Sequence, residues 1–408
     1  MSTIDVESSV TLKESMGDYW SRVKAGDIGA LPAVLGLVAL CAVFGAMSDV
    51  FLTPGNFANL LTQAAAVIVI AMGLVFVLLL GEIDLSAGYA SGVCGAVLVI
   101  LITNKGWPWY AALAVSILVG AVLGFSIGSL VSRLGIPSFV VTLAAFLGFQ
   151  GLLLLLAGEG GTIRIEDKVI LSVENNNLTP AASWVFFILA AGTYVLLGLN
   201  RINNRRKAGL KSELFKLWLA KTSGLLLVMA IAVYALNLER SNNPDLVSLK
   251  GIPIVVPVIL GLLVIGTFVL GRTAFGRHIY AVGGNAEAAR RAGINVKRVR
   301  TAAFVICSSL SAIAGMLFAS RQNSISPTTG GSSTLLYAVG AAVIGGTSLF
   351  GGKGKMRDAI LGGLVVAVID NGMGLLGYAA GIKYIVTGAV LLVSAGVDAV
   401  SRRGASST

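Results

Sequence analysis

Twelve long apolar segments limit what this chain can fold into more than any other feature of its sequence. Each is close to the roughly 20 residues that a helix needs to cross the hydrocarbon core of a bilayer. Because backbone polar groups inside lipid must bond within their own segment, helices are favoured there. The sequence therefore predicts an all-α polytopic membrane protein. The segments are residues 31–48, 58–80, 87–103, 109–131, 136–157, 183–199, 217–238, 253–270, 301–320, 335–350, 359–376 and 384–398.

The composition supports this fold class. Only 12% of the residues are charged, whereas soluble domains carry roughly a quarter. The chain has 51 glycines among 408 residues, and small residues let transmembrane helices approach closely. The net charge of +11 is typical of nucleic-acid-binding proteins. Its excess lies in loops between apolar segments, however, where it determines membrane orientation.

The basic residues predict that both termini lie in the cytoplasm. If the chain begins inside and crosses at every segment, 23 Lys and Arg fall inside and 7 fall outside, as the positive-inside rule requires. The predicted organisation is a cytoplasmic tail (1–30), a transmembrane permease domain (31–398) and a second cytoplasmic tail (399–408). Segments 183–250 are interpreted as an insertion into a core of ten spans.

One cytoplasmic loop, residues 271–300, carries a local folding signal. Its sequence is GRTAFGRHIYAVGGNAEAARRAGINVKRVR, with seven basic residues and a single acid, Glu287. Asn285 is a good N-cap, Glu287 lies in the first turn where the helix dipole favours an anion, and Gly293 supplies a stop. A short helix at the membrane surface is therefore expected. The equally basic stretch 201–221 lacks such a signal, so its charge indicates only topology.

Acidic side chains occur beside or inside two apolar segments. The motif GEIDLSAG, residues 81–88, contains Glu82, Asp84 and Ser86, and Asp370 and Asn371 lie within the eleventh segment. Ionisable residues at such positions usually face a cavity or a partner. A role in a translocation pathway is one interpretation. Location at the membrane interface or at a helix end is the other.

Glycines are expected to break a helix near residues 343–355, VIGGTSLFGGKGK. Non-helical backbone at membrane depth is tolerated only inside protein or beside a water-filled cavity. The pathway candidates here are Gly345, Gly346, Thr347 and Ser348. Residues 81–88 and 345–352 also match at both end glycines and at a leucine, which is a weak internal repeat of the kind transporters contain.

No enzymatic motif is found. A phosphate-binding loop requires G-x-x-x-x-G-K-[ST], but Gly354 stands where Ser or Thr should follow Lys353. The cysteines at 41, 94 and 307 lie in apolar segments without metal-like spacing. His278 is the only histidine and gives no metal site. The expectation is a protein that is not an enzyme and has no catalytic residue, cofactor or metal.

Four motifs in order carry a family resemblance: GEIDLSAG, GRHIYAVGGNAEAARRAGINV (276–296), VIGGTSLFGGKG and IDNG (369–372). Together they resemble the membrane permeases of bacterial ABC sugar importers that serve ribose, xylose, galactose and arabinose. The inserted segments 183–250 resemble those of the xylose-transporting members. The resemblance implies the bacterial inner membrane, a second permease copy (identical or not), cytoplasmic ATPase subunits, an external sugar-binding protein and a monosaccharide such as xylose.

The resemblance also implies that the 276–296 region is a coupling loop that docks onto the ATPase. The residues assigned to it are Arg277, Gly283, Gly284, Asn285, Ala286, Glu287, Ala288, Ala289, Arg290, Gly293 and Ile294. Two departures from the family pattern lie elsewhere. Leu335-Leu336-Tyr337 replaces an acidic pattern, and Lys383 stands where relatives are usually uncharged.

Two other function classes remain open at this point. An ion- or proton-coupled secondary transporter would use Glu82, Asp84 or Asp370 as its ion site. It gives no reason for a capped cytoplasmic helix between glycines. A membrane scaffold or channel subunit explains the glycines but not the set of motifs.

Overall fold

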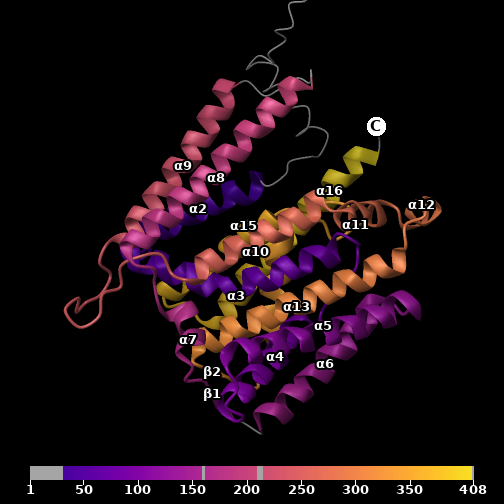
Figure 1. Ribbon diagram of the computed structural model, residues 1–408, viewed down its shortest axis with the longest axis horizontal. Helices are drawn as coiled ribbons and strands as arrows, with labels where there is room; N and C mark the ends of the chain where they lie inside the picture. Colours follow the sequence, from indigo (N-terminus) through magenta and orange to yellow (C-terminus); the bar gives the residue numbers. More distant parts are fainter. Residues whose placement is uncertain (1–30, 159–160, 209–214, 407–408) are drawn as a thin grey trace, which may run out of the picture. The chain divides into compact units, whose positions relative to one another are not determined.

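The computed structural model describes residues 31–158, 161–208 and 215–406 of the chain (Figure 1). The predicted tail 1–30 lies outside these residues, as do 407–408 of the predicted tail 399–408. The elements are α2 (Leu31–Met47), α3 (Pro54–Leu78), α4 (Ala87–Thr103), α5 (Trp109–Arg133), α6 (Ser138–Ala157), β1 (Ile163–Arg164), α7 (Lys168–Asn175), α8 (Pro180–Lys207), α9 (Phe215–Asn237), α10 (Val255–Arg272), α11 (Ala274–Gly284), α12 (Ala286–Arg291), α13 (Val296–Gln322), β2 (Ser324–Ile325), α14 (Ser332–Ile344), α15 (Met356–Leu375) and α16 (Ala380–Ser406).

Every predicted apolar segment contains a helix, so the predicted helical fold class is confirmed. Eight of the described helices are long and apolar enough to cross a membrane: α3, α5, α6, α8, α9, α10, α13 and α15. Four apolar helices are shorter, namely α2, α4, α14 and the part of α16 at Ala380–Gly396.

The prediction was wrong or silent at several places. The predicted helical segment 335–350 is too long at its C-terminal end. Helix α14 ends at Ile344, where the glycine-rich loop begins. Helices α7 and α11 were not predicted as elements. The antiparallel pairing of β1 with β2, which joins Ile163 to Ile325, was also missed, since a two-residue strand leaves no periodic pattern.

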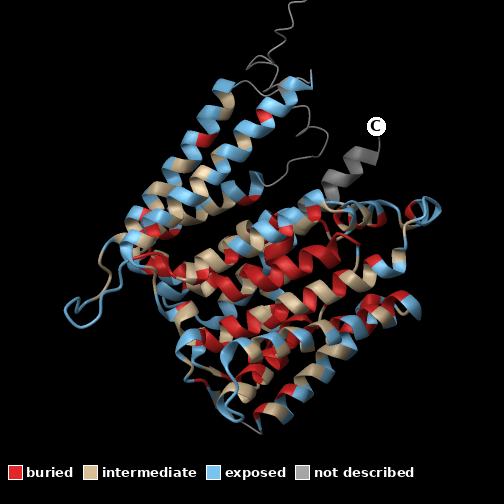
Figure 2. Cartoon of the chain, in the orientation of Figure 1, coloured by how far each residue is buried: buried red, intermediate tan, exposed pale blue. Residues whose placement is uncertain are grey.

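The described chain divides into two compact units. The smaller comprises, among the described residues, 400–406 at the end of α16 and Asn177–Ile252, a segment in which α8 and α9 pack against each other. The ends of this segment are joined by a hydrogen bond from the Leu178 N–H to the Ile252 carbonyl, 2.8 Å. Most side chains of both helices are exposed or partly exposed (Figure 2). Because many of these are large and apolar, the pair suits a lipid environment.

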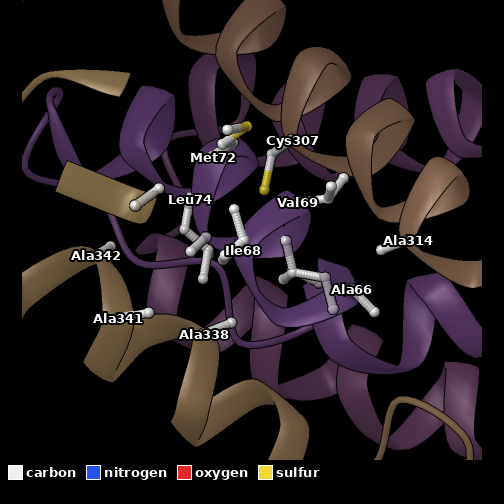
Figure 3. Packing of buried hydrophobic residues seen from close by; sticks show 14 of the residues in the cluster. Ala66, Ile68, Val69, Met72, Leu74, Cys307, Ala314, Ala338, Ala341 and Ala342 are labelled. Carbon is white, nitrogen blue, oxygen red and sulfur yellow. The ribbon is translucent and has the colours of Figure 1, made fainter. Parts of the chain in front are cut away.

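The larger unit comprises Gly29–Asn176 and Pro253–Ala399, and α3 and α13 form its centre. In Figure 1 these two helices run side by side, although more than two hundred residues separate them. Figure 3 shows α3 side chains such as Val69 and Met72 beside Cys307 of α13, with alanines of α14 on another side. Burial is densest along these central helices (Figure 2).

Glycines explain how closely α5 approaches α13. Gly120, Gly124 and Gly128 are spaced four residues apart, so they share one face of α5. A Cβ atom at any of them would overlap backbone atoms of α13, such as Cα of Thr301, 2.8 Å from that of Gly128. The expectation that glycine permits close helix packing is confirmed at this contact.

Candidate functional site

The predicted cytoplasmic loop 271–300 is almost entirely helical. It contains α11, the short helix α12, and the first turn of α13. Asn285 caps α12 as predicted, since its Oδ1 accepts a hydrogen bond from the Ala288 N–H at 2.9 Å. Glu287 lies in the first turn, and Gly293 (φ +84°) follows the last one. The local signals were sufficient because capping depends on neighbouring residues only.

Helix α11 was missed, although the sequence carries a signal for it. The Thr273 hydroxyl caps its start by accepting from the Gly276 N–H at 3.1 Å. Ile279 and Val282 are both buried and lie three residues apart, which is the spacing of one helix face.

The predicted docking residues differ in how they are presented. Exposed members are Arg277, Gly284, Asn285, Glu287, Ala288, Arg290 and Gly293, while Gly283, Ala286 and Ile294 are partly covered. Ala289 is only 5% exposed. Its methyl group therefore faces the protein and supports α12, so it offers little surface to a partner.

Charges on α12 are arranged around Glu287. Its carboxylate lies 2.9 Å from Arg290 Nη2 and 3.2 Å from Arg291 Nε. Hydrogen bonds from Arg290 and then Arg291 lower the pKa of the Glu287 carboxyl. Both pairs are largely exposed, so they contribute little to stability and mainly present fixed charge at the protein surface.

The motif at 81–88 is a break between two helices. Helix α3 ends at Leu78, and α4 begins at Ala87. Asp84 is fully buried in this first break, and its Oδ1 accepts from the Ser86 N–H at 2.9 Å and from the Ser86 hydroxyl at 2.6 Å. Asp84 and Ser86 thus shape the break, and neither lies at an interface with solvent.

Glu82 has a different neighbour. Its Oε1 lies 3.2 Å from Nε of Arg300, and both side chains are mostly buried. Arg300 is the fifth residue of α13. The ion pair therefore links the first break to the helix that follows α12.

The predicted break at Gly345–Gly352 is confirmed as non-helical chain between α14 and α15. Asp358 organises it, because its Oδ2 accepts from the Lys355 N–H at 2.7 Å and the Thr347 hydroxyl at 3.2 Å. A third hydrogen bond in this break joins the Ser348 N–H to the Lys353 carbonyl at 2.9 Å. Thr347 and Ser348 are buried.

The two breaks meet each other and the end of α11. The Gly352 N–H donates to the Leu79 carbonyl at 2.9 Å. A Cβ atom at Gly283 would overlap the same carbonyl oxygen, and one at Gly351 would lie 2.9 Å from the Gly283 oxygen. We call Leu79, Gly283, Gly351 and Gly352 the glycine junction. The Tyr280 hydroxyl adds a hydrogen bond to the Gly354 carbonyl at 2.7 Å.

Sequence reasoning treated the docking loop and the two breaks as separate sites. The glycine junction brings Gly283 of one set next to the chain that carries Glu82 and next to the break at Gly345–Gly352. No local sequence pattern predicts such a contact, because it is made by backbone atoms of segments that are distant in the sequence.

Asp370 and Asn371 lie apart from the junction, near the other end of α15. Asn371 exchanges two hydrogen bonds of 2.9 Å with Asn56 of α3. Asp370 accepts from Gln63 Nε2 at 2.7 Å and lies 3.5 Å from Lys383 Nζ. Asn56 and Gln63 were missed by sequence reasoning, although polar residues in an apolar helix are themselves a signal.

A family profile described as the permease component of branched-chain amino acid transport systems matches residues 56–395. The chain belongs to this permease family. It is therefore a multi-pass protein of the bacterial inner membrane and a transport subunit rather than an enzyme.

Relatives of this permease carry names of sugar transport systems. The xylose transport system permease protein of Escherichia coli strain K12 is 35% identical, over 97% of this chain and 98% of the relative. Its counterpart in Haemophilus influenzae is 31% identical over 94% and 99%. The D-allose transport system permease protein of Escherichia coli strain K12 is 29% identical over 89% of each chain. No solved structure matches this permease significantly.

Proposed function

We propose that this chain is the membrane-spanning subunit of an ATP-driven importer for a monosaccharide, a pentose such as xylose. Its motifs and its similarity to xylose permeases along nearly the whole chain support this substrate class. The proposed partners are two cytoplasmic ATPase subunits, an external sugar-binding protein and a second permease copy. In this arrangement twelve segments cross the membrane and both termini are cytoplasmic.

The observation that carries the proposal is the contact of the α11–α12 region with both helix breaks. α12 presents exposed charges to the cytoplasm, while α11 ends against Leu79 and Gly352. A push or pull on α12 by a partner is thereby transmitted to the chain that separates α3 from α4 and α14 from α15. A partner that binds two states with different affinity shifts the equilibrium between them.

In this mechanism the breaks are the movable part of the pathway. Glu82, Asp84 and Ser86 shape one break, and Gly345, Gly346, Thr347 and Ser348 shape the other. Non-helical backbone at such positions is tolerated beside a water-filled route. Closure of the ATPase pair would draw α11 inward and change access to that route.

The docking surface is tested by replacing Gly284 with Phe. A Cβ atom there meets nothing within 4 Å, so the chain accepts the side chain, which then projects towards the partner. We expect sugar-stimulated ATP hydrolysis in the reconstituted complex to fall at least about tenfold, a loss of roughly 1.4 kcal/mol in coupling. Gly261→Phe, equally open on α10, is the matched control. Normal stimulation with Gly284→Phe would refute docking at this surface.

The buried carboxyl of Asp84 favours a second candidate, a proton-coupled secondary transporter, because buried ionisable groups in membrane proteins often carry protons. Uptake into proteoliposomes separates the two functions. The importer requires internal ATP together with the ATPase and persists when an uncoupler removes the proton gradient. Collapse of uptake on adding the uncoupler alone would favour the second candidate.

A further inference from the structure

A group of polar side chains lies where α3, α14, α15 and α16 meet, and Asp370 is at its centre. The two carboxylate oxygens have different partners. Oδ2 accepts from Gln63 at 2.7 Å, and Oδ1 faces the Lys383 ammonium at 3.5 Å. Asp370 follows the start of α15 by fourteen residues, so the group is roughly 20 Å along that helix from the second break.

Two tyrosines border this ion pair. Tyr384 follows Lys383 on α16, and its ring centroid is 6.3 Å from that of Tyr337 on α14. Tyr384 is 53% exposed, so a flat aromatic face with a hydroxyl at its edge stands open beside the charges.

The neighbouring Asn56–Asn371 pair shows what a purely structural contact looks like here. Each asparagine is 7% exposed, and the two side chains satisfy each other with reciprocal hydrogen bonds. This pair already fastens α3 to α15. The Asp370–Lys383 pair differs, because 27% of the Asp370 side chain and 21% of the Lys383 side chain remain exposed.

Exposed charges on apolar helices need an explanation. A charged side chain facing lipid is costly, and such residues usually line a water-filled route or meet protein. Space is also kept for the ammonium group, since a Cβ atom at Gly374 would lie only 3.1 Å from Lys383 Nζ. The open side of the pair therefore faces water or a partner rather than lipid.

We propose that Gln63, Tyr337, Asp370, Lys383 and Tyr384 bind the hydroxyl groups of the transported monosaccharide in the part of the pathway remote from the glycine junction. The proposal rests on the sugar-import function. A carboxylate accepts hydrogen bonds, an ammonium donates them and an amide does both, which suits a ring with adjacent hydroxyls. Because the paired charges cancel, the site favours a neutral polyol over an ion or a sugar phosphate.

The test measures which sugars are taken up, since a structural tether would not alter selectivity. The complete importer is reconstituted in proteoliposomes with ATP inside, and uptake of D-xylose is compared with that of its monodeoxy analogues. For each sugar, the uptake rate of the variant is divided by the uptake rate of the wild type. The preference of the sugar-binding protein is the same in both and therefore cancels. Lys383→Met is expected to lower xylose uptake about tenfold. For the analogue that lacks the contacted hydroxyl, the fold-loss should be about five times smaller, because that contact is already absent.

Two further variants complete the design. Tyr384→Leu changes a side chain that is more than half exposed, so it tests the site without opening a cavity in the core and should shift the same ratios. Lys250→Met is the matched control, because Lys250 pairs with Glu239 at 3.8 Å in the smaller unit. This variant should take up every sugar at the wild-type rate.

The outcomes separate this proposal from the one it rests on. An equal loss for every sugar in Lys383→Met and Tyr384→Leu would make the cluster a tether and overturn the proposal alone. Unchanged uptake in both variants would place the cluster outside the pathway, with the same consequence. Failure of the wild-type complex to import any pentose with ATP would instead refute the proposed function, and the sugar site with it.

Discussion

At the scale of single residues, Glu174 is a carboxyl group in surroundings that disfavour its charge. It lies near the end of α7 and is 6% exposed. Neither carboxylate oxygen has a hydrogen-bond partner among the described residues. Burial raises the pKa of Glu174 to about 8, although the charge of Arg321 acts in the opposite direction.

The raised pKa predicts that stability falls with increasing pH. Unfolded glutamate has a pKa of about 4.3. The cost of burying the charge is therefore absent below that pH, grows as pH rises, and is complete above pH 8. Glu174→Gln should raise the free energy of unfolding at pH 9 by on the order of a few kcal/mol and leave it little changed near pH 4. Thermal unfolding in detergent at both pH values measures this.

Glu239 provides the control of opposite sign. Its carboxylate accepts N–H groups of Leu249 and Ser241, which lower its pKa to about 2. Its stabilising contribution is present above the unfolded pKa and is lost as pH falls towards 2. Glu239→Gln should therefore lower the melting temperature at neutral and high pH. An equal response of both variants would contradict the assignment for Glu174.

The Glu82–Arg300 ion pair predicts a transport defect without a folding defect. Glu82→Gln removes the charge that holds the first break to the start of α13. We expect sugar uptake to fall about threefold to tenfold, because the charge contact that couples the first break to α13 is lost, while the glutamine amide keeps the size and hydrogen-bonding capacity of the side chain. The amount of assembled complex should persist. Arg300→Lys, which keeps the charge, should be milder, and unchanged uptake in Glu82→Gln would restrict the pair to a structural role.

At the scale of elements, α11 is the part of the chain that links surface to interior. Local signals predicted α12, because a cap and a glycine stop act within a few residues. They did not predict the glycine junction, where Gly283 meets Leu79 and Gly352 from two distant segments. The partners of Asp370 escaped prediction for the same reason, because Gln63 and Lys383 come from other helices.

Gly283 provides the prediction at this scale. A methyl group at this position would overlap the Leu79 carbonyl oxygen, so Gly283→Ala forces α11 away from the breaks. We expect sugar uptake to fall at least about tenfold, while the complex still assembles, because local close-packing strain of this kind costs typically 1–3 kcal/mol. Gly271→Ala is the control, since nothing lies within 4 Å of a Cβ atom there. Wild-type uptake in Gly283→Ala would show that the contact does not transmit motion.

At the scale of the whole molecule, the apolar pattern was enough to predict twelve helices and the membrane class. Period and length are properties of each segment alone, and lipid imposes the helix on every one of them. The pattern could not reveal that the described chain forms two compact units. That division depends on which helices contact each other, such as α13 with α5, α3 and α4 in the larger unit.

Membrane orientation is the prediction that belongs to this scale. Cytoplasmic termini place Leu246, which is 82% exposed, on the outer side and Lys297 on the inner side. In a variant whose Cys41 is replaced, a membrane-impermeant maleimide should label Leu246→Cys in intact cells. It should label Lys297→Cys only after permeabilisation, with a difference of about tenfold or more. The reverse pattern would invert the proposed topology.

The bond from the Gly352 N–H to the Leu79 carbonyl has a consequence for how such a gene can diverge. Because it joins two loops through main-chain atoms, its formation does not depend on which side chain occupies position 79. Substitutions there need only preserve the packing of the helices. Position 283 has the opposite character, since even one added carbon collides with the neighbouring strand of chain. Selection on the glycine junction should therefore exclude any side-chain carbon at position 283, while it requires no particular side chain at position 79.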